Sequence, residues 1–600
     1  MKFMQYIDRK IAPVTLSALL KAFFSTFALC NIGSFSSSGI LSMAVFGLLL
    51  LFFLRADAIK TDDVNADGWP RFFAPACAVL ALFFTFFYVA AEHQNLTGSF
   101  DSGLFRAIYL LFTALGLYTL FCSGIRLLMI IFAKTPAQIQ TRPLSRRWKL
   151  LIFAGLLLCW LPWFLYDFPG VMSPDSISQF SQATGLKGYS DHHPVMHTLL
   201  ISLCYKVGFG LTGSTNAGIA CYTIVQMLLL SLIETGCLSL LAQKGVSRKL
   251  LVLWFLFWGL VPYNGIFAVT MWKDVLFSAF MLLYVMELFA LLSAKQLSLK
   301  KHWKLLAGLA LSGWLVCMFR SNGLYVFLFM LPFTLIAFRK NLKLMGGLQI
   351  LVLALALLVK GSVYDAWDVE KPHFTESLSI PLQQVACVVS NGRELTEDQK
   401  ESINQIVDIS LIPDYYNPVI SDPIKALVLY NNADYLEEHK GEYFRLWLQI
   451  GLQHPGDYVQ AFIDQTKGYW FPAPATLRTN EGISPNEIGL SWPKILRGMV
   501  PVKISEILLK LPDILPVYGI LWSIGAFTWL LLFLTVFQFL YGKKEYLLLY
   551  LPFIGVILTL LIATPVASDI RYAYSVLLGM PFLISAALLT RRAEALPPEG

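Results

Sequence analysis

Charged residues are scarce in this chain. Asp, Glu, Lys and Arg make up only 14% of its 600 residues, against 56% hydrophobic residues, and the mean hydropathy is +0.63. Soluble globular domains carry about 25% charged residues, so the composition excludes a water-soluble globule of this length. The net charge of +8 does not indicate nucleic-acid binding, because the positive charge follows the membrane topology described below. The sequence is that of a polytopic membrane protein.

Three other signals are missing. Eight of the nine cysteines lie in apolar segments, where a thiol acts as a small hydrophobe, and only Cys387 lies in a polar region. This distribution predicts neither a disulfide framework nor a zinc site of the ribbon type. No removable signal peptide is evident, because the first apolar run lacks a small-residue cleavage site. The polar region 361–515 also lacks the period-two alternation of strands, so we expect an all-α fold.

Apolar runs long enough to cross a bilayer recur along the chain. A helix needs roughly 17 to 25 such residues to cross about 30 Å of hydrocarbon. We therefore expect about fourteen transmembrane helices, near 12–33, 39–55, 72–91, 104–133, 149–166, 216–243, 249–268, 275–294, 303–319, 322–338, 344–360, 516–540, 545–563 and 571–590.

Lys and Arg fall at every second boundary between these runs, from Lys2 and Arg9 at one end to Arg591 and Arg592 at the other. Basic loops are retained in the cytoplasm, so both termini are predicted to be cytoplasmic in a multi-pass protein of the cell (plasma) membrane. The alternation holds only if the apolar segment 194–211 does not cross. We expect that segment to lie on, or dip into, the outer face.

This topology divides the chain into four predicted regions. They are an N-terminal transmembrane extension (1–148), a transmembrane core (149–360) with an outer loop (167–215), an extracytoplasmic domain (361–515) and C-terminal transmembrane helices (516–600). The region 361–515 carries 12 basic and 21 acidic residues, a net charge of −9, whereas the remainder carries +17. Its apolar periodicity is helical.

The outer loop begins with YDFPGVMSPDSISQF, which contains Asp167 and Asp175. Ser173 and Pro174 predict the start of a short helix, and Asp175 could simply complement the positive end of that helix. Alternatively, Asp175 is a carboxylate held at the membrane surface, where partial loss of water would raise its basicity and suit it to act as a general base.

The loop continues with SDHHPVMH, which predicts a second helix starting at Pro194 with His193 as its cap. Asp191, His192, His193 and His197 offer nitrogen and oxygen donors that could converge on a metal ion. Helix capping and hydrogen bonding to a phosphate explain the same residues, so a protein-bound metal stays open.

Three cations stand at predicted outer ends of spans: Lys273 in MWKD, Arg320 between two spans, and Arg571 in SDIRY. Such cations often only anchor a helix to lipid headgroups. If they face the same loop as Asp175, they could instead bind a phosphate or pyrophosphate, with Arg offering a two-pronged contact that Lys cannot make.

These features together resemble the GT-C superfamily of integral membrane glycosyltransferases, and within it a bacterial family of polytopic proteins. The resemblance rests on the PDS motif after a span, the HP-containing helix, the KD pair and the R-Y pair before the last helix, and it covers roughly 149–590. The sequence departs from the GT-C pattern where Val195 replaces the second proline of HPPL and where Ser176 follows Asp175 in place of a second acid. A second carboxylate would then come from Asp167 or Asp191.

The resemblance implies transfer of a sugar from a polyprenyl-phosphate donor to a glycan, lipid or protein acceptor of the cell envelope. Asp175 would be the general base, and His192, His193, His197, Lys273, Arg320 and Arg571 would contact the substrates, with or without a divalent cation. Two other classes remain open. A transporter or flippase of lipid-linked precursors would show inverted repeats, broken helices and paired charges within the spans. The sequence shows no repeat, and the acids within spans, Glu234 and Glu287, lack an obvious Lys or Arg partner in the sequence. A non-catalytic scaffold would use the outer domain only to dock partners.

Overall fold

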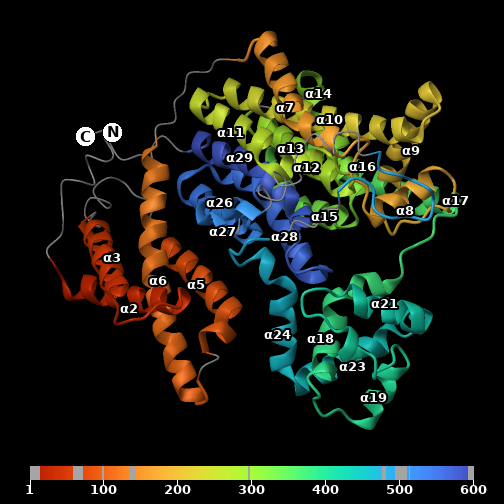
Figure 1. Cartoon of the computed structure of the whole chain (residues 1–600). Coiled ribbons are helices and arrows are strands. Elements are labelled where there is room, and N and C mark those ends of the chain that lie inside the picture. The colour runs from red at the N-terminus through yellow and green to blue at the C-terminus, as the bar shows by residue number, and fades with distance from the viewer. Residues whose placement is uncertain are drawn as a thin grey trace. The chain divides into compact units, whose positions relative to one another are not determined.

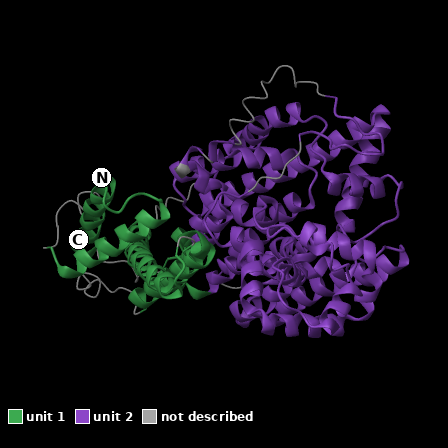
Figure 2. Ribbon diagram, turned by 60° about the horizontal axis from the view of Figure 1, so that its bottom comes forward, with its two compact units in different colours: residues 1–137, 532–544, 586–600 green, residues 138–531, 545–585 purple. Residues whose placement is uncertain are grey.

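The computed structural model describes residues 14–58, 72–97, 100–135, 143–294, 297–475, 481–493, 510–512 and 514–591. These residues form helices and turns, with a few isolated β-bridges and no strand (Figure 1). The all-α fold is therefore confirmed for the described part of the chain. Two compact units can be distinguished, one of residues 1–137, 532–544 and 586–600 and the other of 138–531 and 545–585 (Figure 2).

The first unit is built around four long helices: α2 (Leu16–Ile32), α3 (Ile40–Ala58), α5 (Phe73–Thr97) and α6 (Gly103–Lys134). Helices α2 and α6 pack closely, and the Ser25 hydroxyl donates to the Gly116 carbonyl at 2.9 Å. The same unit takes in residues 532–544 and 586–591, and Arg591 donates to the carbonyls of Phe132 and Ala133. The N-terminal helices thus share their unit with part of the C-terminal segment.

The second unit contains the helices of the predicted core and of the C-terminal region. They are α7 (Arg146–Tyr166), α8 (Pro174–Ala183), α9 (Val195–Thr212), α10 (Thr215–Gln243), α11 (Arg248–Leu260), α12 (Pro262–Val269), α13 (Lys273–Leu292), α14 (Leu299–Phe319), α15 (Ser321–Ala337), α16 (Leu342–Leu358), α26 (Pro516–Gly519) and α28 (Leu551–Ala563). Two more helices belong to it in part: α27 (Ile524–Tyr541) as far as residue 531, and α29 (Tyr574–Leu589) as far as residue 585.

Each of the fourteen predicted spans overlaps one helix or a run of two or three consecutive helices among the described residues. Among the described residues, eleven helices are long and apolar enough to cross a membrane, or up to twelve if α11 and α12, which bend by 54°, form one span. The protein is therefore a multi-pass membrane protein. Helices α2, α15 and α28 are apolar but shorter, whereas α9, predicted not to cross, meets the length and apolarity criteria. The number fourteen stays a prediction.

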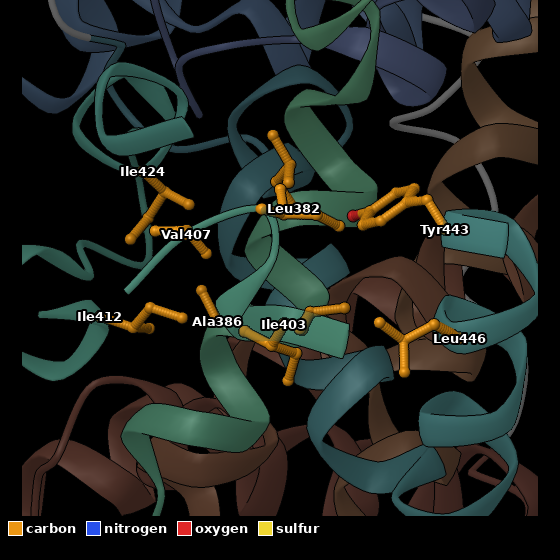
Figure 3. A pocket seen from close by; sticks show the side chains of 10 residues that line it. Leu382, Ala386, Ile403, Val407, Ile412, Ile424, Tyr443 and Leu446 are labelled. Atoms are coloured by element: carbon orange, nitrogen blue, oxygen red, sulfur yellow. The ribbon is translucent and has the colours of Figure 1, made fainter. Parts of the chain in front are cut away.

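The predicted extracytoplasmic domain is helical over its described residues. It contains α18 (Ser379–Ser390), α19 (Glu397–Asn404), α20 (Ile412–Tyr415), α21 (Asp422–Asn431), α22 (Ala433–Glu438), α23 (Lys440–Gln453) and α24 (Pro455–Thr466). These helices enclose their own apolar core, to which α18 contributes Leu382, Val385 and Ala386. The core contains a cavity of about 20 Å³ lined by aliphatic side chains and Tyr443 (Figure 3). Such a volume holds about one water molecule, so we assign no ligand to it.

This helical domain is also tied to the segment that connects α28 to α29. Four hydrogen bonds of 2.7–2.9 Å join them: Ser421 N to the Pro565 carbonyl, Ala567 N to the Val419 carbonyl, Tyr469 Oη to the Val566 carbonyl, and Gln465 Nε2 to the Thr564 carbonyl. The connecting segment 564–567 ends four residues before Arg571.

Candidate functional site

The floor of the candidate site consists of three chain segments joined through their backbones. Val171 lies beside Thr270 in a parallel bridge, with Val171 N donating to Val269 O and Met271 N donating to Val171 O, both at 2.9 Å. On the other side, Met172 is bridged to Ile483. Because Val171 and Thr270 are in register, α8 and α13 begin next to each other, and the residues in their first turns face one another.

Side chains reinforce this junction. The Ser176 hydroxyl donates to the Met271 carbonyl at 2.7 Å, and Trp272 Nε1 donates to the Ser173 hydroxyl at 2.7 Å. Gly170 makes the turn possible, since its φ is +149° and a Cβ there would collide with the Thr223 hydroxyl. Helix α8 begins at Pro174 after Ser173, as predicted, and places Asp175 in its first turn.

Asp175 meets two of the predicted cations. Its Oδ2 lies 3.0 Å from Arg571 Nη1, which donates a hydrogen bond, and 4.0 Å from Lys273 Nζ. Its Oδ1 lies 4.0 Å from His193 Nε2. The Asp175 side chain is 33% exposed, whereas those of Lys273, Arg571 and His193 are 17%, 16% and 8% exposed. The structure thus brings together residues that lie up to 396 positions apart.

The cations correct one expectation from the sequence. Burial by itself raises the pKa of the Asp175 carboxyl, but Lys273 and Arg571, together with the hydrogen bond from Arg571, outweigh that effect and hold the pKa below its ordinary value. The raised basicity predicted for Asp175 is therefore wrong for this arrangement, because partial loss of water is accompanied by positive neighbours that the loop sequence does not contain.

Arg571 has little freedom to move. Besides Asp175, its guanidinium contacts the Asp569 carboxylate, with 3.3 Å between Nε and Oδ2, and donates from Nη2 to Tyr572 Oη at 2.6 Å. The guanidinium also lies over the rings of Trp272 and Tyr572, 5.0 and 4.6 Å from their centroids. These contacts hold the cation in place, with hydrogen bonds to Asp175 and Tyr572, an ion pair with Asp569 and a ring on either side.

Arg320 is more deeply placed. Its Nε lies 3.1 Å from Asp274 Oδ1, and its Nη1 donates to the Tyr572 carbonyl at 2.7 Å. The side chains of Arg320 and Asp274 are 9% and 2% exposed. A Cβ at Gly323 would collide with the Val316 carbonyl, so glycine allows the tight turn between α14 and α15 that sets Arg320 here. Arg320 is therefore suited to position Tyr572 and Asp274 rather than to reach a ligand.

We refer to Asp175, Lys273, Asp274, Arg320, Asp569 and Arg571 as the charged cluster. Its three carboxylates and three cations balance when all are ionised. All six residues stand where helices begin: Asp175 in the first turn of α8, Lys273 and Asp274 in the first turn of α13, and Arg320 as the N-cap of α15. Asp569 is the N-cap of the 3₁₀ turn η7 (Ile570–Ala573) before α29, and Arg571 lies within that turn. Helix N-termini carry partial positive charge, so the surroundings of the cluster favour anions.

The three predicted histidines divide between two environments. Lys273 Nζ lies 3.0 Å from His193 Nδ1, and because an ammonium group can only donate, Nδ1 accepts and the ring is neutral. Burial and the adjacent Lys273 lower the pKa of His193 well below its usual range, in agreement. The exposed His192 packs edge-on against His193, with ring centroids 4.5 Å apart. His193 thus joins the charged cluster through Lys273.

His197 does not join the cluster. Its ring is fully buried, with Nδ1 2.9 Å from Gln179 Oε1 and Nε2 2.6 Å from Tyr222 Oη. Tyr222 donates to Gln226, which in turn donates to three carbonyls of the segment 267–270. One helical turn separates His193 from His197, yet the two rings face different partners. His197 links α8, α9 and α10 beneath the site.

The two further acids predicted as catalytic also lie in other contacts. Asp191 Oδ2 accepts from Lys360 Nζ at 3.1 Å, where Lys360 lies in a π-helical turn (Val359–Val363) after α16. Asp167 is 5% exposed, and its Oδ1 accepts from Gly482 N at 2.9 Å. Asp167 therefore holds the segment 481–484 against the floor of the site, and neither acid contacts Asp175.

Asp167 gives a pH-dependent prediction. Burial raises its pKa from 3.8 to about 7, against the opposing effect of the Gly482 hydrogen bond and with a further increase from Glu481. An unfolded Asp loses its proton near 3.8, so wild-type stability should fall as the pH rises from about 4 to 7. Asp167→Asn keeps the acceptor oxygen and lacks the titration. We expect its apparent Tm in detergent to exceed that of wild type by a margin that grows from pH 5 to pH 8. A margin that is the same at both pH values would contradict this assignment.

The donor set does not fit a metal ion. Among the described residues, no group of three or more His, Cys, Asp and Glu side chains is placed to hold one. The predicted convergence of Asp191, His192, His193 and His197 is absent, because His193 faces Lys273, His197 faces Tyr222 and Asp191 faces Lys360. The carboxylates of the charged cluster are each next to a cation, which would oppose a second positive charge.

Residues 187–597 match a family described as "Family of unknown function (DUF6020)". The chain belongs to this family. The match includes Lys273, Arg320 and Arg571 and begins after Asp167 and Asp175. No curated protein and no solved structure matches the chain. The family description gives no activity, so a function can be inferred only from the geometry of the site.

Several residues of the site had no assigned role in the sequence. Asp274 and Asp569 are neighbours of predicted cations, but their pairing with Arg320 and Arg571 depends on the packing of distant helices. Trp272 and Tyr572 are part of the quoted MWKD and SDIRY motifs, and both rings lie against Arg571. An aromatic residue next to a cation at the start of a span is the signal that could have indicated them.

Proposed function

We propose that this protein is a membrane glycosyltransferase of the GT-C type that transfers a sugar from a polyprenyl-phosphate donor to an acceptor of the cell envelope. The observation that carries the proposal is the partly exposed Asp175 carboxylate in contact with Arg571 and Lys273, at a place where several apolar helices begin. A base and two cations within about one side-chain length suit a reaction that removes a proton from one group and releases a phosphate from another.

The reaction we propose is a single displacement at the anomeric carbon. Asp175 accepts the proton of an acceptor hydroxyl, whose oxygen forms a bond to the sugar while the bond from the sugar to the phosphate oxygen breaks. Lys273 and Arg571 neutralise the charge that develops on the leaving phosphate. Inversion at the anomeric carbon follows. Asp167 and Asp191 are the next candidates for the base. His193 lies 4.0 Å from Asp175 and the exposed His192 packs against His193, so we propose that this pair contacts the substrates.

The membrane setting completes the proposal. With α9 lying at the outer face and not crossing, the alternation of basic loops supports fourteen spans with both termini in the cytoplasm. The loop 167–215 and the domain 361–515 would then lie outside a bacterial plasma membrane. A lipid-borne donor would then present its phosphate at the level where α13 and α29 begin. The acceptor is a glycan, lipid or protein of the envelope, which the acidic helical domain could help to bring in.

Two observations favour a transporter or flippase as the second candidate. Both carboxylate oxygens of Glu234 are buried within α10 and have no hydrogen-bond partner among the described residues. The bend of 54° between α11 and α12 is a break of the kind that transporters use. A buried acid within the membrane is a functional hypothesis by default. By contrast, Glu287 accepts a hydrogen bond from Ser312 at 2.7 Å, which accounts for it as a link between α13 and α14.

Label transfer separates these candidates. Purified protein in lipid nanodiscs should move radiolabelled sugar from a polyprenyl-phosphate donor to an envelope fraction, tested over a panel of donor sugars. A transporter would instead move an intact labelled lipid between the leaflets of proteoliposomes without forming a new glycosidic bond. Absence of transfer from every donor, together with such movement, would reject the glycosyltransferase proposal.

Arg571→Lys tests the role of the guanidinium. Lysine keeps the charge, but one ammonium cannot replace three guanidinium nitrogens that reach Asp175, Asp569 and Tyr572. We expect kcat/KM for the lipid donor to fall roughly ten- to hundredfold, or about 1–3 kcal/mol. Arg393→Lys, which alters a half-exposed pair with Asp457 in the helical domain, is the matched control. Equal kcat/KM for wild type and Arg571→Lys would leave Arg571 as a headgroup anchor.

A further inference from the structure

Asp175 occupies the position that an anionic ligand of the charged cluster would take. It is the most exposed of the three carboxylates: its side chain is 33% exposed, against 2% for Asp274 and 1% for Asp569. It also contacts both Arg571 and Lys273, whose side chains are 16% and 17% exposed and so are more open to solvent than that of Arg320, at 9%. Asp175 is therefore the carboxylate of the cluster that is most open to exchange with an anion from solvent.

We propose that a phosphate or pyrophosphate group competes with the Asp175 carboxylate for Arg571 and Lys273, so that binding of the phosphate releases Asp175. The inference rests on the proposed function, which it deepens by assigning the resting partner of the cations and the event that frees the base. The ligand chemistry is a phosphate ester or anhydride, carried either by a lipid or by a free ion.

The two cations are held so that they stay in place when Asp175 leaves. Arg571 keeps Asp569, Tyr572 Oη and the ring of Trp272. Lys273 keeps His193 Nδ1 at 3.0 Å. Neither hold depends on Asp175. By contrast, the Asp175 carboxylate contacts Arg571, Lys273 and His193 and has no other hydrogen bond or ion pair among the described residues. It can turn toward solvent by rotation about its side-chain bonds.

The charge of the cluster favours this exchange. With Asp175 turned away, three cations face two carboxylates, and the beginnings of α8, α13 and α15 add partial positive charge. A phosphate offers more oxygen atoms and more charge than a carboxylate, and guanidinium binds it strongly. The site is therefore balanced with Asp175 in place and attracts an anion once Asp175 moves.

The exchange resolves the conflict between the position of Asp175 and its proposed role. While Arg571 and Lys273 contact the carboxylate, its pKa is held down and it is a poor base. Once a phosphate takes over the cations, their effect on Asp175 weakens, and a negative group nearby favours the protonated acid. The base would thus be active only when the donor is bound.

Binding to Asp175→Asn tests the inference. The full chain in nanodiscs is titrated with inorganic phosphate, with inorganic pyrophosphate and with a long-chain isoprenyl phosphate, and Trp272 beneath Arg571 provides a fluorescence signal. Without the competing charge, we expect binding about tenfold tighter than wild type, the change that corresponds to removing one charge-assisted hydrogen bond as competitor. Asp175→Ser, a second neutral variant, should behave in the same way. Asp422→Asn, whose partner Lys425 keeps Glu376, should bind like wild type.

The outcomes are distinct. Tighter binding of the isoprenyl phosphate alone supports a lipid-borne ligand, whereas tighter binding of all three probes supports recognition of the phosphate by itself. Equal or weaker binding of every probe by both folded neutral variants overturns the inference. If wild type transfers sugar but the variants bind no more tightly, the competition fails and the proposed function stands. If the variants bind more tightly but wild type transfers no sugar, the competition stands and the proposed function fails.

Discussion

Asp175→Asn is expected to lower the rate of sugar transfer by a factor of about 10² or more, the usual contribution of a positioned general base. Asparagine has nearly the same size and keeps an oxygen that can accept from Arg571 Nη1, so helix α8 and the floor of the site should survive. The variant lacks only the negative charge and the ability to take a proton. Initial rates with saturating donor and acceptor measure the effect.

Two controls make this result decisive. Thermal unfolding in detergent should be close to that of wild type, which separates lost chemistry from lost folding. Asp422→Asn, an exposed carboxylate of the helical domain, should transfer at the wild-type rate. Near-normal transfer by a folded Asp175→Asn protein would return Asp175 to the role of a helix-start residue and shift the search for the base to Asp167 and Asp191.

Arg320→Met is expected to destabilise the protein by about 3–5 kcal/mol, the typical loss when one partner of a buried ion pair is removed. The methionine leaves Asp274, which is 2% exposed, without its nearest cation, and the Tyr572 carbonyl loses a 2.7 Å hydrogen bond. The free energy of unfolding in mixed micelles measures the effect. Lys400→Met removes an exposed pair with Glu397 and should change little.

The double variant Arg320→Met, Asp274→Leu adds a second test of the same pair. Removing both charges leaves neither one buried alone, so much of the lost stability should return. If the double variant regains stability but kcat/KM for the lipid donor stays low, Arg320 is needed to position Tyr572 and Arg571. A loss below about 1 kcal/mol in Arg320→Met would contradict the buried pair.

The helical part of the fold could be predicted well from the sequence because its signals are local. Apolar runs, the pair Ser173–Pro174 and the absence of alternation each depend on neighbouring residues, and helices form where they indicated. The break at Pro262 between α11 and α12 was harder to see, since both halves lie in one apolar run. Which helices cross the membrane is harder to predict, because some are close to the shortest length that can span it. Helix α9 has 18 residues and is long enough, whereas α15, with 17 residues, is just shorter.

The sequence pointed to individual residues of the candidate site, but it did not predict which of them contact one another. Asp175, Lys273 and Arg571 stand out because charges at the ends of apolar spans are unusual. Their contacts depend on the register of Val171 with Thr270 and on the packing of η7, which no local pattern encodes. The sequence predicted a raised pKa for Asp175, and this was wrong for the same reason: the cations that lower the pKa come from distant parts of the chain. His197 has the residue type and spacing of a ligand, but Gln179 and Tyr222 use both its nitrogens.

The hydrogen bonds between the helical domain and the segment 564–567 have a consequence for dissecting the protein. Val419, Ser421, Gln465 and Tyr469 pair with backbone groups only a few residues before Arg571. If this domain were removed and the gap closed with a linker, the backbone groups of 564–567 would lose these hydrogen-bond partners. The free energy of unfolding would fall by the contribution of several hydrogen bonds. The domain is therefore not a detachable module, and a shortened chain would lose the alignment of Arg571 along with it.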